Sequence, residues 1–164
     1  MKKLLILLML LMVVPSVGNA QRLQWEKGYF LDEFEDPMPE YPFYSLMLPM
    51  SNSDNYLRMR VSVAYGIEFI LPYSSFGLYH ELKIKKANGS VIVVPTNSDD
   101  EQVYQVDLSS FWDVVDLLAK GNITLSFIGY HDFTDTYAHT YTVKIKQQTQ
   151  TITQILNKLG IRRY

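Results

Sequence analysis

Residues 56–71, YLRMRVSVAYGIEFIL, contain the clearest strand pattern in the chain. Apolar residues occupy every second position from 57 to 65, and Arg58 and Arg60 fall on the opposite parity. This period of two predicts a half-buried β-strand, because successive side chains of a strand point to opposite faces of the sheet. The alternation stops at Gly66 and then resumes, so we expect a second strand that forms a hairpin with the first.

Alternating segments on both sides of this stretch predict further strands. Asn88-Gly89 lies between two of them and is a strong hairpin signal. The segment 36–49 is different because it carries four prolines, and a proline has no N–H to donate to a strand ladder. We therefore expect an edge or a loop there. The other expected strands are residues 25–34, 78–85, 91–94, 103–108, 123–127 and 141–145.

Two segments change from a period of two to helical spacing. Ser110 and Asp113 fit a capping box ahead of an apolar face, and Gly121 can end that helix. Apolar residues recur at helical spacing after Thr149, so we expect a docked C-terminal helix. The predicted fold class is mainly β, an antiparallel β-sandwich or half-open barrel with one short inserted helix and a C-terminal helix.

The first twenty residues have the features of a secretory signal peptide. Lys2 and Lys3 precede an apolar run, and the small residues Gly18 and Ala20 end it. The apolar run is too short to anchor the chain in a bilayer, and no second run of membrane length follows. We expect residues 1–20 to be removed and the remainder to be exported, soluble, and periplasmic or extracellular.

Composition restricts the partners and the chemistry of the mature chain. Residues 21–164 are 144 residues, a size typical of one domain, and we expect a single β-rich domain. They keep 13 basic against 17 acidic residues, a net charge of −4 that argues against nucleic acid as a partner. The absence of cysteine excludes disulfides, thiolate chemistry and lipid attachment through a thioether.

A motif opens the mature chain, and it consists of Trp25, Tyr29, Leu31, Asp32-Glu33-Phe34 and Asp36-Pro37. It resembles a group of small exported Bacteroidetes proteins that begin with Trp and then Tyr-x-Val-Asp-Glu-Phe-Gly-Asp/Glu-Pro. The likeness extends in the same order over most of the mature chain. It implies export and a β-rich domain, and it transfers no catalytic or binding residue. Glu35 stands where the motif has glycine, which puts the tight backbone conformation expected after Phe34 in question.

Acidic residues dominate the segment between Lys27 and Arg58, which contains no base. Carboxylate oxygens are ligands for Ca²⁺, so Asp32, Glu33 and Asp36 are the first candidates for a metal site, with Ca²⁺ the one candidate cofactor. The spacing of a calcium-binding loop is absent. The alternative is a solvated strand edge whose charges discourage aggregation.

Other residues leave chemical alternatives open. The loop from His131 to His139 contains two histidines and two aspartates, enough for a zinc or transition-metal site, although a polar hairpin tip has the same composition. No serine lies in a Gly-x-Ser-x-Gly elbow. Glu68, Glu81 and Asp107 could supply the paired carboxylates of a glycosidase.

Lysines on two expected strands form a possible basic strip with exposed tyrosines, suited to glycans or anionic surfaces; the alternative is that they keep the strands soluble. They are Lys83, Lys85, Lys86, Lys144 and Lys146. We expect an exported cell-envelope binding or structural domain, glycan- or protein-binding, that is not an enzyme. The alternatives are a small metal-dependent hydrolase and a surface-assembly subunit, for which the proline-rich segment 36–49 is the candidate donor strand.

We predict that export cleaves the chain within a few residues of Ala20, because the small residues there end the apolar run. Intact-mass measurement of the protein secreted by a bacterial host checks this, and a mass that includes Met1 would contradict it.

Overall fold

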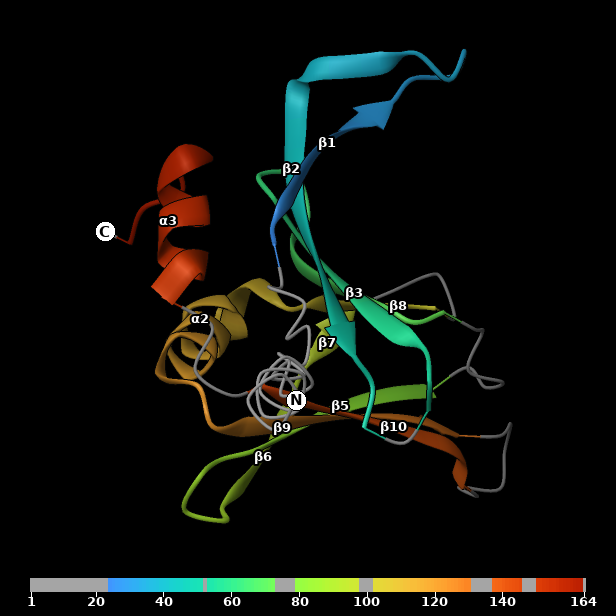
Figure 1. The fold of residues 1–164 in the computed structure, drawn as a ribbon, viewed down its shortest axis with the longest axis vertical. Coiled ribbons are helices and arrows are strands. Elements are labelled where there is room, and N and C mark those ends of the chain that lie inside the picture. Colours follow the sequence, from blue (N-terminus) through green and yellow to red (C-terminus); the bar gives the residue numbers. More distant parts are fainter. Residues whose placement is uncertain are drawn as a thin grey trace, which may run out of the picture.

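Two antiparallel sheets face each other across one apolar core (Figure 1). The computed structural model describes residues 24–51, 53–72, 79–97, 102–130, 137–145 and 150–163. The first sheet holds, in spatial order, β1 (Glu26–Leu31), β2 (Pro37–Pro49), β3 (Tyr56–Ser62), β4 (Gly66–Ile70), β8 (Val103–Val106) and β7 (Thr96–Asn97). The second holds β10 (Tyr137–Ile145), β9 (Ile123–Tyr130), β5 (Tyr79–Lys85) and β6 (Val91–Val94). The predicted mainly β class, with two helices, is confirmed.

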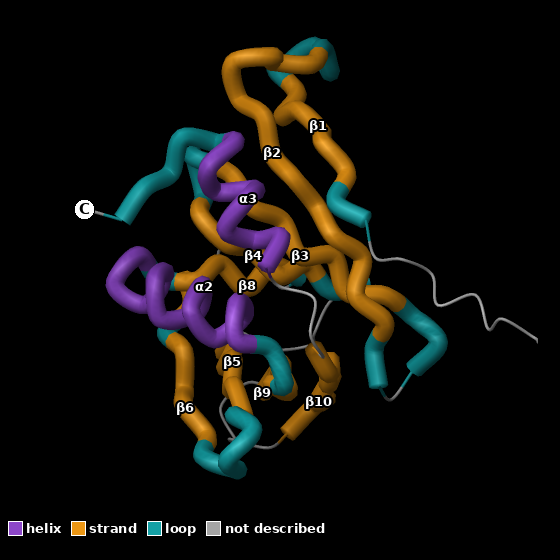
Figure 2. The backbone as a smooth tube through the Cα atoms, turned by 60° about the vertical axis from the view of Figure 1, so that its left-hand side comes forward, coloured by secondary structure: helices purple, strands orange, loops and turns teal. Residues whose placement is uncertain are grey.

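Two helices cover one side of the sheets. After a 3₁₀ turn, η1 (Leu108–Ser110), α2 (Phe111–Lys120) turns its predicted apolar face inward, with Val114 and Leu118 fully buried. The C-terminal helix α3 (Gln150–Lys158) packs against α2 and buries Ile152. Figures 1 and 2 both place α3 beside β2, where the Lys158 ammonium lies 5.6 Å from the centre of the Tyr44 ring. The predicted docked terminal helix is therefore confirmed.

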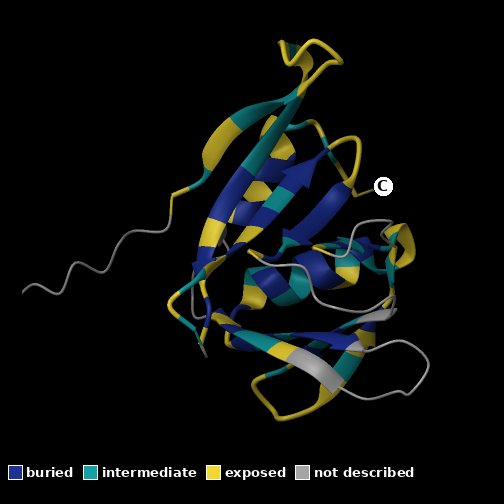
Figure 3. Cartoon of the chain, turned by 90° about the vertical axis from the view of Figure 1, so that its right-hand side faces the viewer, coloured by how far each residue is buried: buried dark blue, intermediate teal, exposed yellow. Residues whose placement is uncertain are grey.

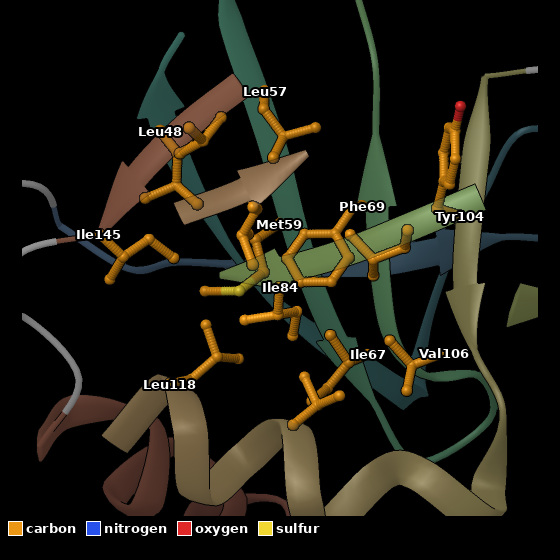
Figure 4. Packing of buried hydrophobic residues seen from close by; sticks show 14 of the residues in the cluster. Leu48, Leu57, Met59, Ile67, Phe69, Ile84, Tyr104, Val106, Leu118 and Ile145 are labelled. Carbon is orange, nitrogen blue, oxygen red and sulfur yellow. The ribbon is translucent and has the colours of Figure 1, made fainter. Parts of the chain in front are cut away.

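Aromatic side chains connect the two sheets at the centre of the core (Figure 4). The ring of Phe127 on β9 lies 5.3 Å from that of Phe69 on β4 and 5.2 Å from that of Tyr104 on β8. Leu118 approaches the same region from α2. Side chains buried this completely contribute on the order of 2 kcal/mol each relative to exposed ones, so this contact accounts for much of the cohesion between the sheets.

Both predicted hairpins are present. β3 pairs with β4 across the turn at residues 63–65, and β5 pairs with β6 across residues 86–90. In the second hairpin Gly89 takes the left-handed conformation with φ +85°, and the Asn88 side-chain oxygen accepts a hydrogen bond from the Ser90 N–H at 3.0 Å. The Lys86 N–H donates to the Ser90 carbonyl at 2.8 Å, so the loop itself is residues 87–89. A left-handed glycine at the last position is typical of such three-residue loops.

The expectation of an edge or loop at 36–49 is only partly right, because the segment is a strand and residues 43–45 have a neighbour on both sides. β2 is a 13-residue strand with β1 on one side and β3 on the other. The prolines fit because β2 pairs with β3 only from Phe43 onward and with β1 only up to Ser45. Pro37, Pro39 and Pro42 thus lie where the strand has one neighbour, the edge position in which sheets tolerate proline. This segment is paired within its own chain, which argues against its use as a free donor strand.

The predicted capping box at Ser110 and Asp113 does not form, since the Ser110 side chain makes no capping hydrogen bond. The preceding 3₁₀ turn takes over this role. The N–H of Phe111 donates to the Leu108 carbonyl, and the Asp107 side chain caps the turn by accepting from the Ser109 N–H at 2.8 Å. The predicted helix end is confirmed, because the Gly121 N–H donates to the Leu117 carbonyl at 3.1 Å.

The hairpin of β1 and β2 extends beyond the rest of the first sheet (Figures 1 and 3). We call residues 29–42 the arm. Between the pairs Tyr29–Pro42 and Leu31–Pro37, β2 advances five residues while β1 advances two. Such a bulge bends a strand pair, and Figure 1 shows β2 turning sharply at this point.

A tight turn closes the arm at its tip, which we define as residues 31–36. The Asp32 side-chain oxygen Oδ1 accepts hydrogen bonds from the N–H groups of Phe34 and Asp36, at 2.9 and 3.0 Å. The Glu35 N–H donates to the Asp32 carbonyl at 3.1 Å. Glu35 has φ +64°. The tight backbone conformation expected after Phe34 is therefore present, although the residue at this position is not glycine.

The predicted signal peptide lies outside the described residues. Among the residues that the structure does describe, no helix is long and apolar enough to span a membrane.

We predict that Glu35→Gly raises the free energy of unfolding by about 1 kcal/mol, because a side chain in the left-handed region is strained and glycine is not. Urea unfolding of both proteins measures the change. Glu33→Gly is the control, since residue 33 has no positive φ and gains nothing from glycine. Equal or opposite effects of the two substitutions would contradict the strain.

Candidate functional site

A groove of about 380 Å³ lies beside the start of α2, between the β3–β4 turn and the tail that follows α3. Leu108 and Val63, at its border, are 80% and 66% exposed. Apolar side chains left exposed around a hollow are typical of binding surfaces. We call this hollow the Trp112 groove, and its lining includes Val63, Leu108, Phe111, Trp112, Ile161 and Arg162.

The 3₁₀ turn holds Leu108 in place at the rim of the groove. The Asp107 carboxylate accepts from the Ser109 hydroxyl at 2.5 Å and from the Asn97 side-chain amide at 2.8 Å. The hydrogen bonds from Ser109, and then that from Asn97, hold the pKa of the Asp107 carboxyl below its usual range. These hydrogen bonds stabilise the folded protein while the Asp107 carboxyl is ionised. Their contribution is therefore present at neutral pH and is lost as the pH falls through the lowered pKa of that carboxyl.

The floor of the groove is shaped by a close approach between Gly66 and the Phe111 ring. Gly66 has φ +68°, and a Cβ there would lie 3.3 Å from the Phe111 ring. The Phe111 ring in turn meets the Trp112 ring edge to face, with 5.1 Å between centroids. Trp112 is thereby oriented by packing before any ligand arrives, which lowers the entropy that binding must overcome.

Positive charge borders the groove. Arg162 is exposed and makes no ion pair or hydrogen bond with any described residue. The next residue, Arg163, donates to Asp116 at 3.0 Å and lies 5.7 Å from the Trp112 ring centre. A second hollow of about 380 Å³ on the other side of the tail is also lined by Trp112 and Arg162. The guanidinium of Arg162 is thus available to a carboxylate from outside.

The apolar surface continues past Val63 onto the base of the arm. Val63 also lines a smaller hollow of about 170 Å³, together with Phe30, Tyr41 and Pro42. Tyr41 is 50% exposed there. The groove and this hollow therefore lie on the two sides of the β3–β4 turn.

The base of the arm packs on an ion pair between β3 and β4. Arg60 on β3 donates two hydrogen bonds to Glu68 on β4, at 2.7 and 2.8 Å. The side chain of Glu68 is 5% exposed. The guanidinium carbon of Arg60 lies 4.9 Å from the centre of the Phe30 ring and 5.6 Å from that of Phe43. Since Phe30 belongs to β1, this contact fixes the base of the arm to β3 and β4.

Because Gly28 has no side chain, the end of the Phe43 ring can lie directly against β1. A Cβ there would collide with the Phe43 ring. The Phe30 ring packs against Phe43 and Tyr65, at centroid distances of 5.2 and 5.3 Å.

The predicted metal candidates Asp32, Glu33 and Asp36 all lie exposed at the arm tip. One oxygen of Asp32 already serves the turn. In the described parts of the chain, no group of three or more Asp, Glu or His side chains could hold a metal ion. The Ca²⁺ hypothesis at these residues stays a prediction. The side chains of the loop from His131 to His139 lie outside the described residues.

The three carboxylates considered for a glycosidase do not come together. Glu68 and Glu81 alternate with core residues of different sheets and therefore lie on opposite outer faces of the molecule. Glu81 forms an ion pair with Lys83 at 2.8 Å, and Asp107 caps the 3₁₀ turn. Glu68 and Glu81 therefore cannot flank one glycosidic bond together.

The lysine strip is present in part. Lys85 and Lys144 lie on either side of Thr124 in the register of the second sheet. Both are exposed. Tyr141 packs toward the core and does not provide an aromatic platform beside them. Lys146 lies outside the described residues.

Comparisons of the chain with protein-family models, curated proteins and solved structures found no match. The site must therefore be interpreted from its own geometry.

The sequence patterns described above do not predict the Trp112 groove. A signal was present, since Leu108 and Trp112 are four residues apart and both lie off the apolar face that Phe111 and Leu118 define. A large aromatic residue on the polar side of an amphipathic helix marks a second contact surface. Its neighbours in the groove come from residues 62–66 and 159–162, which are distant in sequence.

We predict that Arg60→Met lowers the free energy of unfolding by about 3 kcal/mol, because Glu68 is left as an unpaired buried charge. Arg60→Met with Glu68→Leu should recover most of the loss, since no buried charge then remains. Urea denaturation measures both.

Asp116→Ala is the matched control, because it breaks the exposed pair with Arg163 and should change stability by less than about 1 kcal/mol. Equal losses in the single and double Arg60 variants would contradict the assignment.

Proposed function

We propose that this chain is an exported cell-envelope domain that binds protein ligands through the Trp112 groove. The observation that carries the proposal is the hollow of about 380 Å³ with an aromatic floor, whose border residue Leu108 is 80% exposed. Burial of apolar surface drives most protein association, and tryptophan is enriched among the residues that dominate it. Export rests on the signal peptide predicted at residues 1–20.

The lining favours a protein ligand over a glycan. Sugar hydroxyls need several hydrogen-bond partners when they are buried. Among the described lining residues, Ser62 and Arg162 provide the polar side chains, and the Ser62 hydroxyl already accepts from the Tyr65 N–H at 3.1 Å. The matching ligand is a segment with a large apolar side chain next to a carboxylate that pairs with Arg162.

The hydrolase alternative lacks a comparable observation. The described residues that line the groove include no Asp, Glu or His, and general acid–base chemistry needs such a group within hydrogen-bond reach of the substrate. A binding role requires only the shape and the charge that the groove presents.

Selection of a random peptide library displayed on phage against the mature protein tests the proposal. We expect enriched peptides in which an aromatic or large aliphatic residue neighbours Asp or Glu. In fluorescence polarisation with a selected peptide, Trp112→Ala and Arg162→Glu should each weaken binding at least tenfold, as for central interface residues.

Val93→Ser is the matched control, because Val93 is 57% exposed on the second sheet and should leave binding unchanged. Thermal melts establish that each variant is folded. If the loss of Trp112 disturbs α2, Arg162→Glu still tests the groove without changing that packing. Failure to enrich any peptide, or peptides that bind both groove variants as tightly as wild type, would overturn the proposal.

A further inference from the structure

The arm tip presents an apolar side chain in a rigid frame. Phe34 is 75% exposed and its neighbour Leu31 is 56% exposed. The hydrogen bonds of Asp32 to the N–H groups of Phe34 and Asp36 hold the turn in one conformation. Two large apolar side chains at the end of a projecting hairpin have no described contact that buries them, which is the arrangement of an anchor that inserts into a partner.

Negative charge surrounds this anchor. Glu33, Glu35, Asp36 and Glu40 accompany Asp32, and the chain has no base between Lys27 and Arg58. A partner surface must therefore combine an apolar hollow with positive charge at its rim.

The Trp112 groove has both of these properties. Its lining is apolar apart from Ser62 and Arg162, and Arg162 makes no ion pair with a described residue. Arg163 adds a second positive charge, although Asp116 partly balances it. The two surfaces on this chain are thus complementary in both polarity and charge.

The arm cannot reach the groove of its own chain. Arg60, Phe30 and Phe43 fix the arm at its base. In Figures 1 and 3 the tip projects away from the body of the molecule, whereas the groove lies beside α2 and the tail after α3. The arm tip and the Trp112 groove match, but one chain cannot bring them together. The match therefore points to a contact between two chains.

We infer that the occupant of the Trp112 groove is the arm tip of a second copy of this chain. Phe34 enters the hollow beside Trp112, and the acidic residues that flank it lie against Arg162. Because the two contacting surfaces differ, the contact is heterologous. A pair joined by one such contact keeps one free arm and one free groove, so a third copy can add at either end and the assembly can extend from copy to copy. This inference rests on the proposed function, since it names the protein that the groove binds.

Sedimentation velocity of the mature protein, over a hundredfold range of concentration, tests the inference. We expect the mass of the wild type to rise with concentration. Phe34→Ala and Arg162→Glu should each weaken self-association at least tenfold, because they remove the anchor and the charge at the rim. Val93→Ser is the control and should associate as the wild type does.

A mixture of the two variants gives the sharpest test. Phe34→Ala keeps an intact groove and Arg162→Glu keeps an intact arm, so the mixture should form pairs of one copy each and no larger species. A wild type that stays monomeric throughout, a Phe34→Ala variant that associates normally, or a mixture that forms no pairs would each overturn the inference.

The peptide assay, run on the same preparations, separates this inference from the proposed function. A monomeric wild type whose groove still binds the selected peptide would overturn self-assembly and leave the function of the groove standing. Loss of both would overturn both.

Discussion

The ion pair between Arg60 and Glu68 is the interaction on which the shape of this molecule depends. The register of β3 and β4 places the two residues directly opposite each other. Their side chains lie on the outer face of the first sheet, because Met59 and Phe69 take the inner one. The Glu68 side chain is 5% exposed, and the Phe30 and Phe43 rings lie against the guanidinium that pairs with it. The charged pair and the aromatic cover therefore depend on each other, and together they fix the arm.

The fixed arm has consequences for binding. A free two-stranded hairpin is marginally stable in water, and ordering it at the moment of binding would subtract from affinity. Here β2 is continuous from the arm into the body, where it pairs with β3 up to Pro49. The arm is thus part of a six-stranded sheet, and its tip is held in place by the same strand that contributes Leu46 and Leu48 to the core.

Sequence patterns predicted the parts of the fold that depend on local periodicity. The alternation of β3, the glycine after Asn88 and the apolar face of α2 each reflect interactions within a few residues, and all three are confirmed. The prolines of β2 predict an edge, which holds where the strand has one neighbour and fails at residues 43–45, where it has two. The register decides which residues of β2 lie beside β1 and which lie beside β3. The register in turn depends on residues that are distant in sequence.

The candidate site was less predictable for the same reason. The acidic character of the arm tip is visible in the sequence, and it was interpreted as a metal site or a solvated edge. The exposure of Phe34 depends on where the turn places it, and the groove joins a β-turn, a helix start and the C-terminal tail. Because these segments are distant in sequence, no fixed spacing of residues marks the site. Only Leu108 and Trp112, four residues apart, carry a local signal of the groove.

Charge and apolar surface make different contributions to the contact that we infer. Exposed charges such as Glu33 and Arg162 interact through solvent and are screened within about 8–10 Å at physiological salt, so they select and orient the partner more than they hold it. Phe34, Leu108 and Trp112 provide the apolar area, whose burial is not screened. A contact built in this way weakens moderately as salt rises, whereas one held by charge alone would be lost.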